Sequence, residues 1–333
     1  MLFRPFENLN NENEDTKKAN LLLMMFFTAI TLAAMIFVPF VGFVGLAFIP
    51  VPVTLLFISN RYRDAIICAI AGVLILFVFN YVLAIILLAM ICAVAINYKY
   101  IISRNKKLSY RLLSIFASFV IAVLLFLLID SLILKQNVVK EVLRTYNGYV
   151  DNISQDPLLK NYQSLFFPDS AQLNEVIGQT QGFLKYMPVL VPGFAAAFFG
   201  FSAVLNYCFS FIILKKYNIK LEAMPPFKDW DLNWNFCWGV IAGIIFLIIP
   251  KFNPLYDGIL DAIGYNIIIV FGLLYLVLGT AVLWGLFDKF KVRVSVRVII
   301  IVVMFILFGF VAVLPVVGLI DIWANFRKLV RSP

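Results

Sequence analysis

Long apolar runs separated by short polar stretches dominate the chain. A bilayer core about 30 Å thick needs about 20 apolar residues in a helix that rises about 1.5 Å per residue. Runs of that order predict membrane spans at residues 20 to 39, 41 to 59, 65 to 80, 82 to 98, 112 to 134, 186 to 214, 235 to 250, 264 to 287 and 298 to 320. The third and fourth runs meet at Asn80 and Tyr81, so they form either two brief spans or one re-entrant hairpin.

One internal segment, residues 135 to 185, is too polar to span a membrane. Its apolar positions, such as Val139 and Val142, recur at helical spacing, and a second such pattern follows Asp169 and Ser170, either of which is a suitable N-cap. The pattern predicts an extracytoplasmic insert of two amphipathic helices. This insert either covers the membrane face as a cap or forms a lid over a substrate.

Composition supports the membrane assignment. Hydrophobic residues make up 63% of the chain, charged residues make up 14%, and the mean hydropathy is +0.98. The expected fold is therefore an all-α polytopic transmembrane helical bundle of about 8 or 9 spans with a small helical insert. Residues 1 to 19 look like a polar cytoplasmic tail without a cleavage site, followed by blocks at 20 to 134, 135 to 185 and 186 to 333.

Lysine and arginine in short loops orient membrane proteins, because short basic loops stay on the cytoplasmic side. With a cytoplasmic N-terminus, the outer short loops hold Lys251 alone. The inner short loops hold Arg61, Arg63, Lys99, Arg104, Lys106, Lys107, Arg111, Lys215, Lys216, Lys220, Lys228, Lys289, Lys291, Arg293 and Arg297. The C-terminal Arg327, Lys328 and Arg331 disagree with nine spans, so either this tail is outside or the segment around Pro315 turns back.

Several kinds of chemistry have no residues to support them. The chain has no histidine, no GxxxxGK[ST] phosphate loop and no CxxC pair, and its cysteines Cys68, Cys92, Cys208 and Cys237 lie in apolar runs. We therefore expect no enzyme activity, no cofactor and no metal site. The net charge of +9 is expected to reflect topology and attraction to membrane lipid, and not nucleic-acid binding.

Polar side chains within the apolar runs are the candidates for substrate binding, because they are costly in hydrocarbon unless they face a cavity or a partner. They are Asn80, Tyr81, Asp130 and Asn206. Asp130 is either part of a site or a solvated span end, and the others either bind a ligand or bond neighbouring helices. Three prolines, Pro39, Pro50 and Pro52, break the first helical pair and predict a pocket near residues 39 to 53.

The polar stretch MPPFKDWDLNW, residues 224 to 234, lies between two apolar runs. Pro226 ends a helix, and Trp230 suits the membrane interface. Two interpretations are open for this loop: it is an anchored turn, or it docks a cytoplasmic protein partner through Pro226, Phe227 and Trp230.

The pattern KKYNIKLEAMPPFKDWDLNW, together with GLIDIWANFRKL after the last apolar run, resembles the YybS-like family of bacterial membrane proteins. The resemblance extends over nearly the whole chain and implies location in the inner membrane. It further implies a distant similarity to the substrate-binding S-components of energy-coupling-factor transporters. The first helix of those proteins carries an AxxxA face for a transmembrane coupling subunit, and Ala29 and Ala33 match that pattern.

The resemblance implies an S-component-like protein for small-molecule binding or uptake. Such a protein depends on partners for energy, here a transmembrane coupling subunit with ATPases. The alternative is a scaffold or regulator that does not transport and that docks a cytoplasmic partner.

Overall fold

The computed structural model describes residues 22, 25, 31, 45, 47–79, 81–104, 106–132, 135, 137–152, 170–217, 219, 221–252, 258–306 and 312–329. The regular secondary structure in these residues is helical, which confirms the expected all-α class. Among the described residues, five helices are long and apolar enough to cross a membrane: Tyr81–Ser103, Leu108–Leu132, Gly178–Lys216, Trp234–Phe252 and Ile259–Lys289. The protein is therefore a multi-pass membrane protein, and the expected number of spans was approximate.

The chain divides into two compact units that interleave in sequence. Unit 1 comprises Met1–Asn137 and Phe198–Met224, and unit 2 comprises Val138–Ala197 and Pro225–Pro333. The division differs from the blocks expected from the sequence, because residues 198–224 join the N-terminal block. Each unit is described by itself below.

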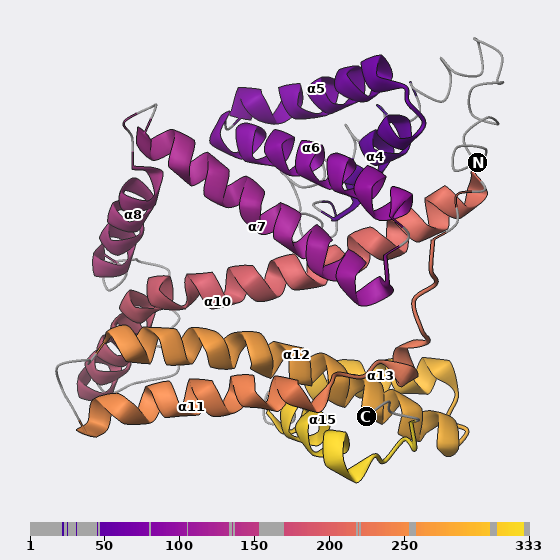
Figure 1. Cartoon of the computed structure of the whole chain (residues 1–333). Coiled ribbons are helices and arrows are strands. Elements are labelled where there is room, and N and C mark those ends of the chain that lie inside the picture. Colours follow the sequence, from indigo (N-terminus) through magenta and orange to yellow (C-terminus); the bar gives the residue numbers. More distant parts are fainter. Residues whose placement is uncertain are drawn as a thin grey trace. The chain divides into compact units, whose positions relative to one another are not determined.

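Unit 1 contains α4 (Pro50–Ile58), α5 (Tyr62–Phe79), α6 (Tyr81–Ser103), α7 (Leu108–Leu132) and the second half of α10 (Ser170–Lys216). The short helix α4 has Pro50 in its first turn and buries all of its residues except Phe57, so it lies in the core (Figure 1). It packs against α5 and α6. The helix α5 ends at Phe79 and α6 begins at Tyr81, on either side of the expected boundary at Asn80, which itself lies outside the described residues.

The helix α10 runs through a boundary that the sequence pattern had placed at residue 185. It begins at Ser170, as the cap signal predicts, and continues for 47 residues to Lys216. At about 1.5 Å per residue it is about 70 Å long, which is about twice the thickness of a bilayer core. The second predicted helix of the insert and the sixth span are therefore one helix.

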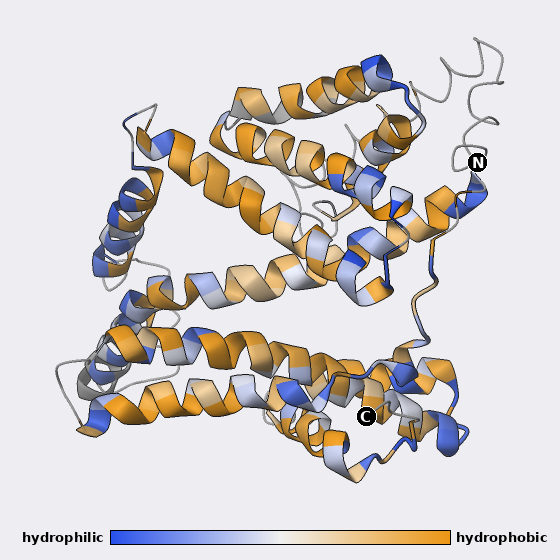
Figure 2. Cartoon of the chain, in the orientation of Figure 1, coloured by the Kyte–Doolittle hydropathy of each residue, from blue (hydrophilic) through white to orange (hydrophobic). Residues whose placement is uncertain are grey.

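The first predicted helix of the insert is α8 (Val138–Asn152), which is polar on much of its surface (Figure 2). In unit 2 it is tied to the start of α10. The Tyr146 hydroxyl donates to the Leu184 carbonyl at 2.8 Å, and Lys185 pairs with Asp151 at 2.8 Å. These contacts hold α8 on a helix that continues as an apolar span.

The rest of unit 2 contains α11 (Cys237–Phe252), α12 (Ile259–Lys289), α13 (Val294–Ile306) and α15 (Val313–Ala324). The helices α11 and α12 lie side by side in Figure 1. Gly279 of α12 and Gly318 of α15 lie at a close crossing, where the backbone nitrogen of Gly279 would be 2.7 Å from a Cβ on Gly318. Any larger side chain at Gly318 would push the two helices apart.

The apolar run expected as a single span at residues 298 to 320 is occupied by parts of two described helices, α13 and α15, of 13 and 12 residues. Residues 307–311, between them, lie outside the described residues. The alternative in which the segment near Pro315 turns back stays a prediction.

Candidate functional site

Two clusters of polar residues organise the described chain, one in each unit. The cluster of unit 1 is centred on Asn206, which is fully buried in α10. Its amide oxygen accepts a hydrogen bond from the Tyr98 hydroxyl at 3.0 Å, and its amide nitrogen donates to the Ala47 carbonyl at 2.7 Å. Asn206 therefore joins α10 to α6 and to the backbone before α4.

Unit 1 buries two more polar groups, Ser202 of α10 and Thr54 of α4. Ser202 lies one turn before Asn206 in α10, and its buried hydroxyl has no hydrogen-bond partner in the described part of the chain. The same holds for the hydroxyl of Thr54 in α4. Native proteins rarely bury such groups without a partner, so these two hydroxyls are candidates for polar contact with a ligand.

The other predicted substrate residues do not gather at this node. Tyr81 is exposed at the start of α6, Asp130 is buried near the end of α7, and Asn80 lies outside the described residues. Much of the pocket predicted near residues 39 to 53 also lies outside them, although Ala47 from this stretch contacts Asn206. Ala29 and Ala33, predicted to bind a coupling subunit, cannot be placed because they too lie outside the described residues.

The cluster of unit 2 begins with the loop before α11. Pro226 precedes a short 3-10 helix, Phe227–Asp229, and the Trp230 indole donates to the Pro225 carbonyl at 3.0 Å. The Phe227 ring packs edge-on against Trp230, with ring centroids 5.1 Å apart, and against Trp284 of α12. Pro226, Phe227 and Trp230, predicted to bind a partner, thus form one folded turn in which both aromatic side chains make contacts within unit 2.

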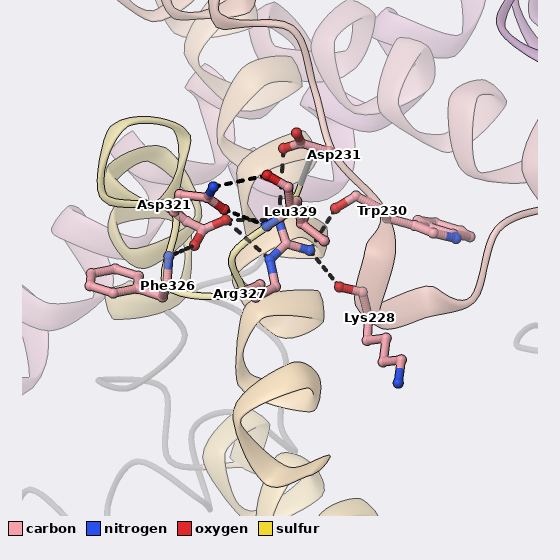
Figure 3. A network of polar contacts seen from close by, with 8 residues as sticks. Lys228, Trp230, Asp231, Asp321, Phe326, Arg327 and Leu329 are labelled. Atoms are coloured by element: carbon pink, nitrogen blue, oxygen red, sulfur yellow. Dashed lines mark hydrogen bonds and ion pairs between the residues drawn. The ribbon is translucent and has the colours of Figure 1, made fainter. Parts of the chain in front are cut away.

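The C-terminal Arg327 binds this turn to the end of α15 (Figure 3). One guanidinium nitrogen, Nη1, donates to the carbonyls of Lys228 and Trp230, each at 2.7 Å. Nη2 lies 2.8 Å from the Asp321 carboxylate, which is buried, and 3.7 Å from Asp231. We call Arg327, Asp321 and the backbone of residues 228 to 231 the arginine anchor.

The end of α15 is shaped to bring Arg327 back onto Asp321. Asn325 adopts the left-handed conformation, with φ of 45°, and its amide side chain bonds the backbone of Leu329 in both directions at 2.8 and 2.9 Å. The Phe326 backbone N–H donates to the second oxygen of Asp321 at 2.8 Å. Asparagine is one of the few residues that tolerate this conformation.

A second group of ion pairs lies beside the anchor. Asp288, at the end of α12, accepts from Lys228 at 2.9 Å and from Arg297 of α13. The hydrogen bond to Asp288 raises the pKa of Lys228. The Arg297 guanidinium also lies over the Trp284 ring, 5.5 Å from its centroid. The end of α12, the start of α13 and the end of α15 therefore meet at one place.

A shallow cleft of about 290 Å³ opens between these groups. Gly285, Leu286 and Phe326 supply its apolar lining. Its charged lining is Lys228, Asp229, Asp288, Lys289, Arg327 and Lys328. Cations outnumber carboxylates here, so the cleft favours anionic groups.

A family model described as "Predicted membrane protein (DUF2232)" matches residues 25–322. The chain belongs to this family. No match was found among curated proteins or among solved structures.

The family match covers the cluster of unit 1 and part of the cluster of unit 2, since it ends at residue 322, before Arg327, and it assigns no role to these residues. The sequence had pointed to the loop at 224 to 234 and to the segment from Gly318 to Arg327 as separate motifs. The structure brings them together through Arg327. The sequence did hint that the C-terminal tail was misplaced, because its basic residues disagreed with the expected topology. No spacing pattern, however, could relate Arg327 to Trp230, which is 97 residues away in the chain.

One further polar contact in this DUF2232 chain was missed entirely. Asn266 of α12 inserts its side chain into α10, where the amide nitrogen donates to the Val189 carbonyl at 2.7 Å and the amide oxygen accepts from the Gly193 N–H. In an intact helix Gly193 would donate to Val189 directly. We call this contact the Asn266 bridge. The sequence carried two signs that could have pointed to this contact. Asn266 is a lone asparagine in an apolar run, and α10 contains Pro188 and Pro192.

Proposed function

We propose that this protein binds a small polar molecule within unit 1 and supports its uptake, in the manner of the S-component of an energy-coupling-factor transporter. The observation that carries the proposal is the buried polar node of Asn206, with the unpartnered hydroxyl of Ser202 one turn away. Polar groups inside a membrane bundle are costly, and they commonly mark a substrate pathway.

The bonding capacity of the node supports a ligand of modest size. The carbonyl oxygen of Asn206 accepts one bond and its amide nitrogen donates one, which leaves a lone pair and a hydrogen on this side chain for a solute. The Ser202 hydroxyl adds a donor and an acceptor. The matching solute is small and rich in hydroxyl, amide or ring-nitrogen groups.

Energy for uptake is proposed to come from partner subunits. The sequence carries no phosphate-binding loop of the GxxxxGK[ST] type, and the resemblance to S-components suggests a coupling subunit that contacts Ala29 and Ala33. Small residues at this spacing allow close approach of a second helix.

The alternative of a docking scaffold has less support. Its proposed contact residues, Phe227 and Trp230, pack on each other, and Phe227 also packs on Trp284. Trp230 further donates to the Pro225 carbonyl. Side chains engaged in this way favour an anchored turn over a surface that is open for a partner.

The test of ligand binding uses Ser202→Ala, because removing a buried hydroxyl without a partner should not harm the fold. Small molecules released on denaturation of the purified protein are identified by mass spectrometry. We expect a compound that is retained by the wild type and reduced at least tenfold in the variant. The matched control is Ser118→Ala, whose hydroxyl already bonds Asn97 and the Ser114 carbonyl. Equal retention by the wild type and Ser202→Ala would show that the compound does not bind at Ser202 and Asn206.

A second experiment tests dependence on partners. Affinity-tagged wild type should co-purify with a coupling subunit and its ATPases in mild detergent. The double variant Ala29→Leu/Ala33→Leu should reach the membrane in normal amount without them, since leucine is more apolar but too large for close helix contact. If the wild type brings down no such subunits, the S-component analogy fails even where ligand retention succeeds.

A further inference from the structure

We propose that the cleft of unit 2 binds the headgroup phosphate of an anionic membrane lipid. The inference is independent of the proposed function, because it concerns only residues of unit 2. It rests on three features of the cleft: cations that no carboxylate neutralises, a position at the end of a membrane span, and a shape held in place by the arginine anchor.

The first feature is the charge that remains after the internal ion pairs are counted. Asp288 is shared by Lys228 and Arg297, and Arg327 is held by Asp321. Lys289 and Lys328 also line the cleft, and neither has an ion-pair partner among the described residues. Asp229 is the one lining carboxylate outside these pairs, and Asp231 lies 3.7 Å from Arg327. The cations of the cleft and its ion pairs (Lys228, Lys289, Arg297, Arg327 and Lys328) therefore exceed the carboxylates (Asp229, Asp231, Asp288 and Asp321) by one charge.

The second feature is location. The cleft lies where α12 ends at Lys289, directly after an apolar helix long enough to cross a bilayer. Large aromatic side chains are exposed around it, with Phe290 71% and Phe326 46% exposed. Two tryptophans, the residue type that collects at the level of lipid headgroups, also lie beside the cleft: Arg327 donates to the Trp230 carbonyl, and Trp284 directly precedes Gly285. An anion that carries an acyl chain therefore fits better here than a free ion in water.

The third feature is that the cleft is preformed. Gly285 forms part of its floor, and a Cβ at this position would lie 3.3 Å from the Arg327 side chain and 3.8 Å from the Lys228 Cβ. The absence of a side chain lets Arg327 cross the end of α12. Because hydrogen bonds already fix the Arg327 side chain, little side-chain entropy is lost when a ligand binds.

The experiment is a titration of purified, delipidated protein with short-chain phosphatidylglycerol, followed by tryptophan fluorescence. Phosphatidylcholine of the same chain length and inorganic phosphate are titrated in parallel. We expect the wild type to bind phosphatidylglycerol saturably and to bind the other two at least tenfold more weakly. Equal binding of inorganic phosphate would show that the site takes a free anion, and equal binding of phosphatidylcholine would show that charge is not recognised. Either result overturns the proposal.

The variant Lys289→Gln/Lys328→Gln assigns the binding to the cleft. A lysine near an anionic surface contributes enough that loss of two should weaken phosphatidylglycerol binding about 30-fold. Both lysines are exposed and unpaired within the described chain, so thermal stability without lipid should not change. The matched control Lys215→Gln/Lys216→Gln removes the same charge from the end of α10. Equal losses in the two double variants would mean that only the overall charge matters, and the proposal would fall.

Discussion

At the scale of single residues, Arg327 shows why a guanidinium and no other cation fits the anchor. Its side chain is 4% exposed, so removing it from water is costly unless every donor is satisfied. Nε and Nη2 both donate to Asp321, while Nη1 serves two carbonyls on the far side. A planar fork with fixed donors meets this geometry, whereas a lysine ammonium is a single point.

Arg327→Lys should therefore destabilise the protein although it keeps the charge. We expect a loss of about 2 kcal/mol in the free energy of unfolding, because at least two buried acceptors lose their donors. The measurement is thermal unfolding in a fixed detergent. The control is Arg293→Lys, an exposed arginine just after α12, which should leave the midpoint unchanged. Equal midpoints for wild type and Arg327→Lys would mean that the anchor contributes charge alone.

At the scale of elements, neighbouring elements bond the backbone of α10 near its two internal prolines. Pro188 has no N–H for the Leu184 carbonyl, and the Tyr146 hydroxyl of α8 donates to that carbonyl instead. The Asn266 bridge contacts the following turn, at Val189 and Gly193. Broken backbone at membrane depth is tolerated only where protein covers it, and α12 provides that cover.

Asn266→Leu should disrupt this junction. The Val189 carbonyl and the Gly193 N–H would lose their partners in an apolar setting, so we expect a cost of about 2 to 4 kcal/mol. The control on the same helix is Thr280→Val, since the Thr280 hydroxyl donates only to the Leu276 carbonyl of its own helix. Thermal unfolding in detergent compares the two. A variant at Asn266 as stable as the control would show that Gly193 and Val189 can bond each other directly.

The same elements show how far the sequence leads. The helical insert, the cap at Ser170 and the helix boundary near Asn80 follow from local periodicity and capping, and the structure has all three. Local patterns do not reveal whether two adjoining helical segments join, so the continuity of α10 was not predicted. Hydropathy likewise gives a single signal over residues 298 to 320, where the described residues belong to two helices, α13 and α15.

The candidate site was predictable only in part, for a related reason. Asn206 stood out because a polar residue in an apolar run needs a partner, but nothing local identified that partner as Tyr98 or the Ala47 carbonyl. Arg327 was noted as a basic residue of the C-terminal tail, yet its pairing with Asp321 depends on the turn at Asn325. Pairings of this kind are decided by tertiary packing.

At the scale of the whole molecule, the polar cluster of unit 2 bears on which side of the membrane the C-terminal residues lie. The arginine anchor places the C-terminal residues 327 and 328 beside the loop at 228 to 231, and Arg297 beside Asp288 places the start of α13 there as well. Because this segment starts and ends beside the same loop, we predict that it enters the bilayer and returns on the same side. The basic C-terminal tail, which disagreed with nine spans, then agrees with the positive-inside rule.

Cysteine labelling tests this topology. In a background without the four native cysteines, single cysteines replace Lys291, Lys328 and Pro254 in three separate variants. With residues 294 to 324 entering and leaving on one side, the cysteines at 291 and 328 should both resist an impermeant maleimide in intact cells and react after lysis. The cysteine at 254, at the other end of α12, should react in intact cells. If 328 reacts in intact cells while 291 does not, the segment crosses the bilayer, and the contact between Arg327 and the Trp230 carbonyl cannot exist in the membrane.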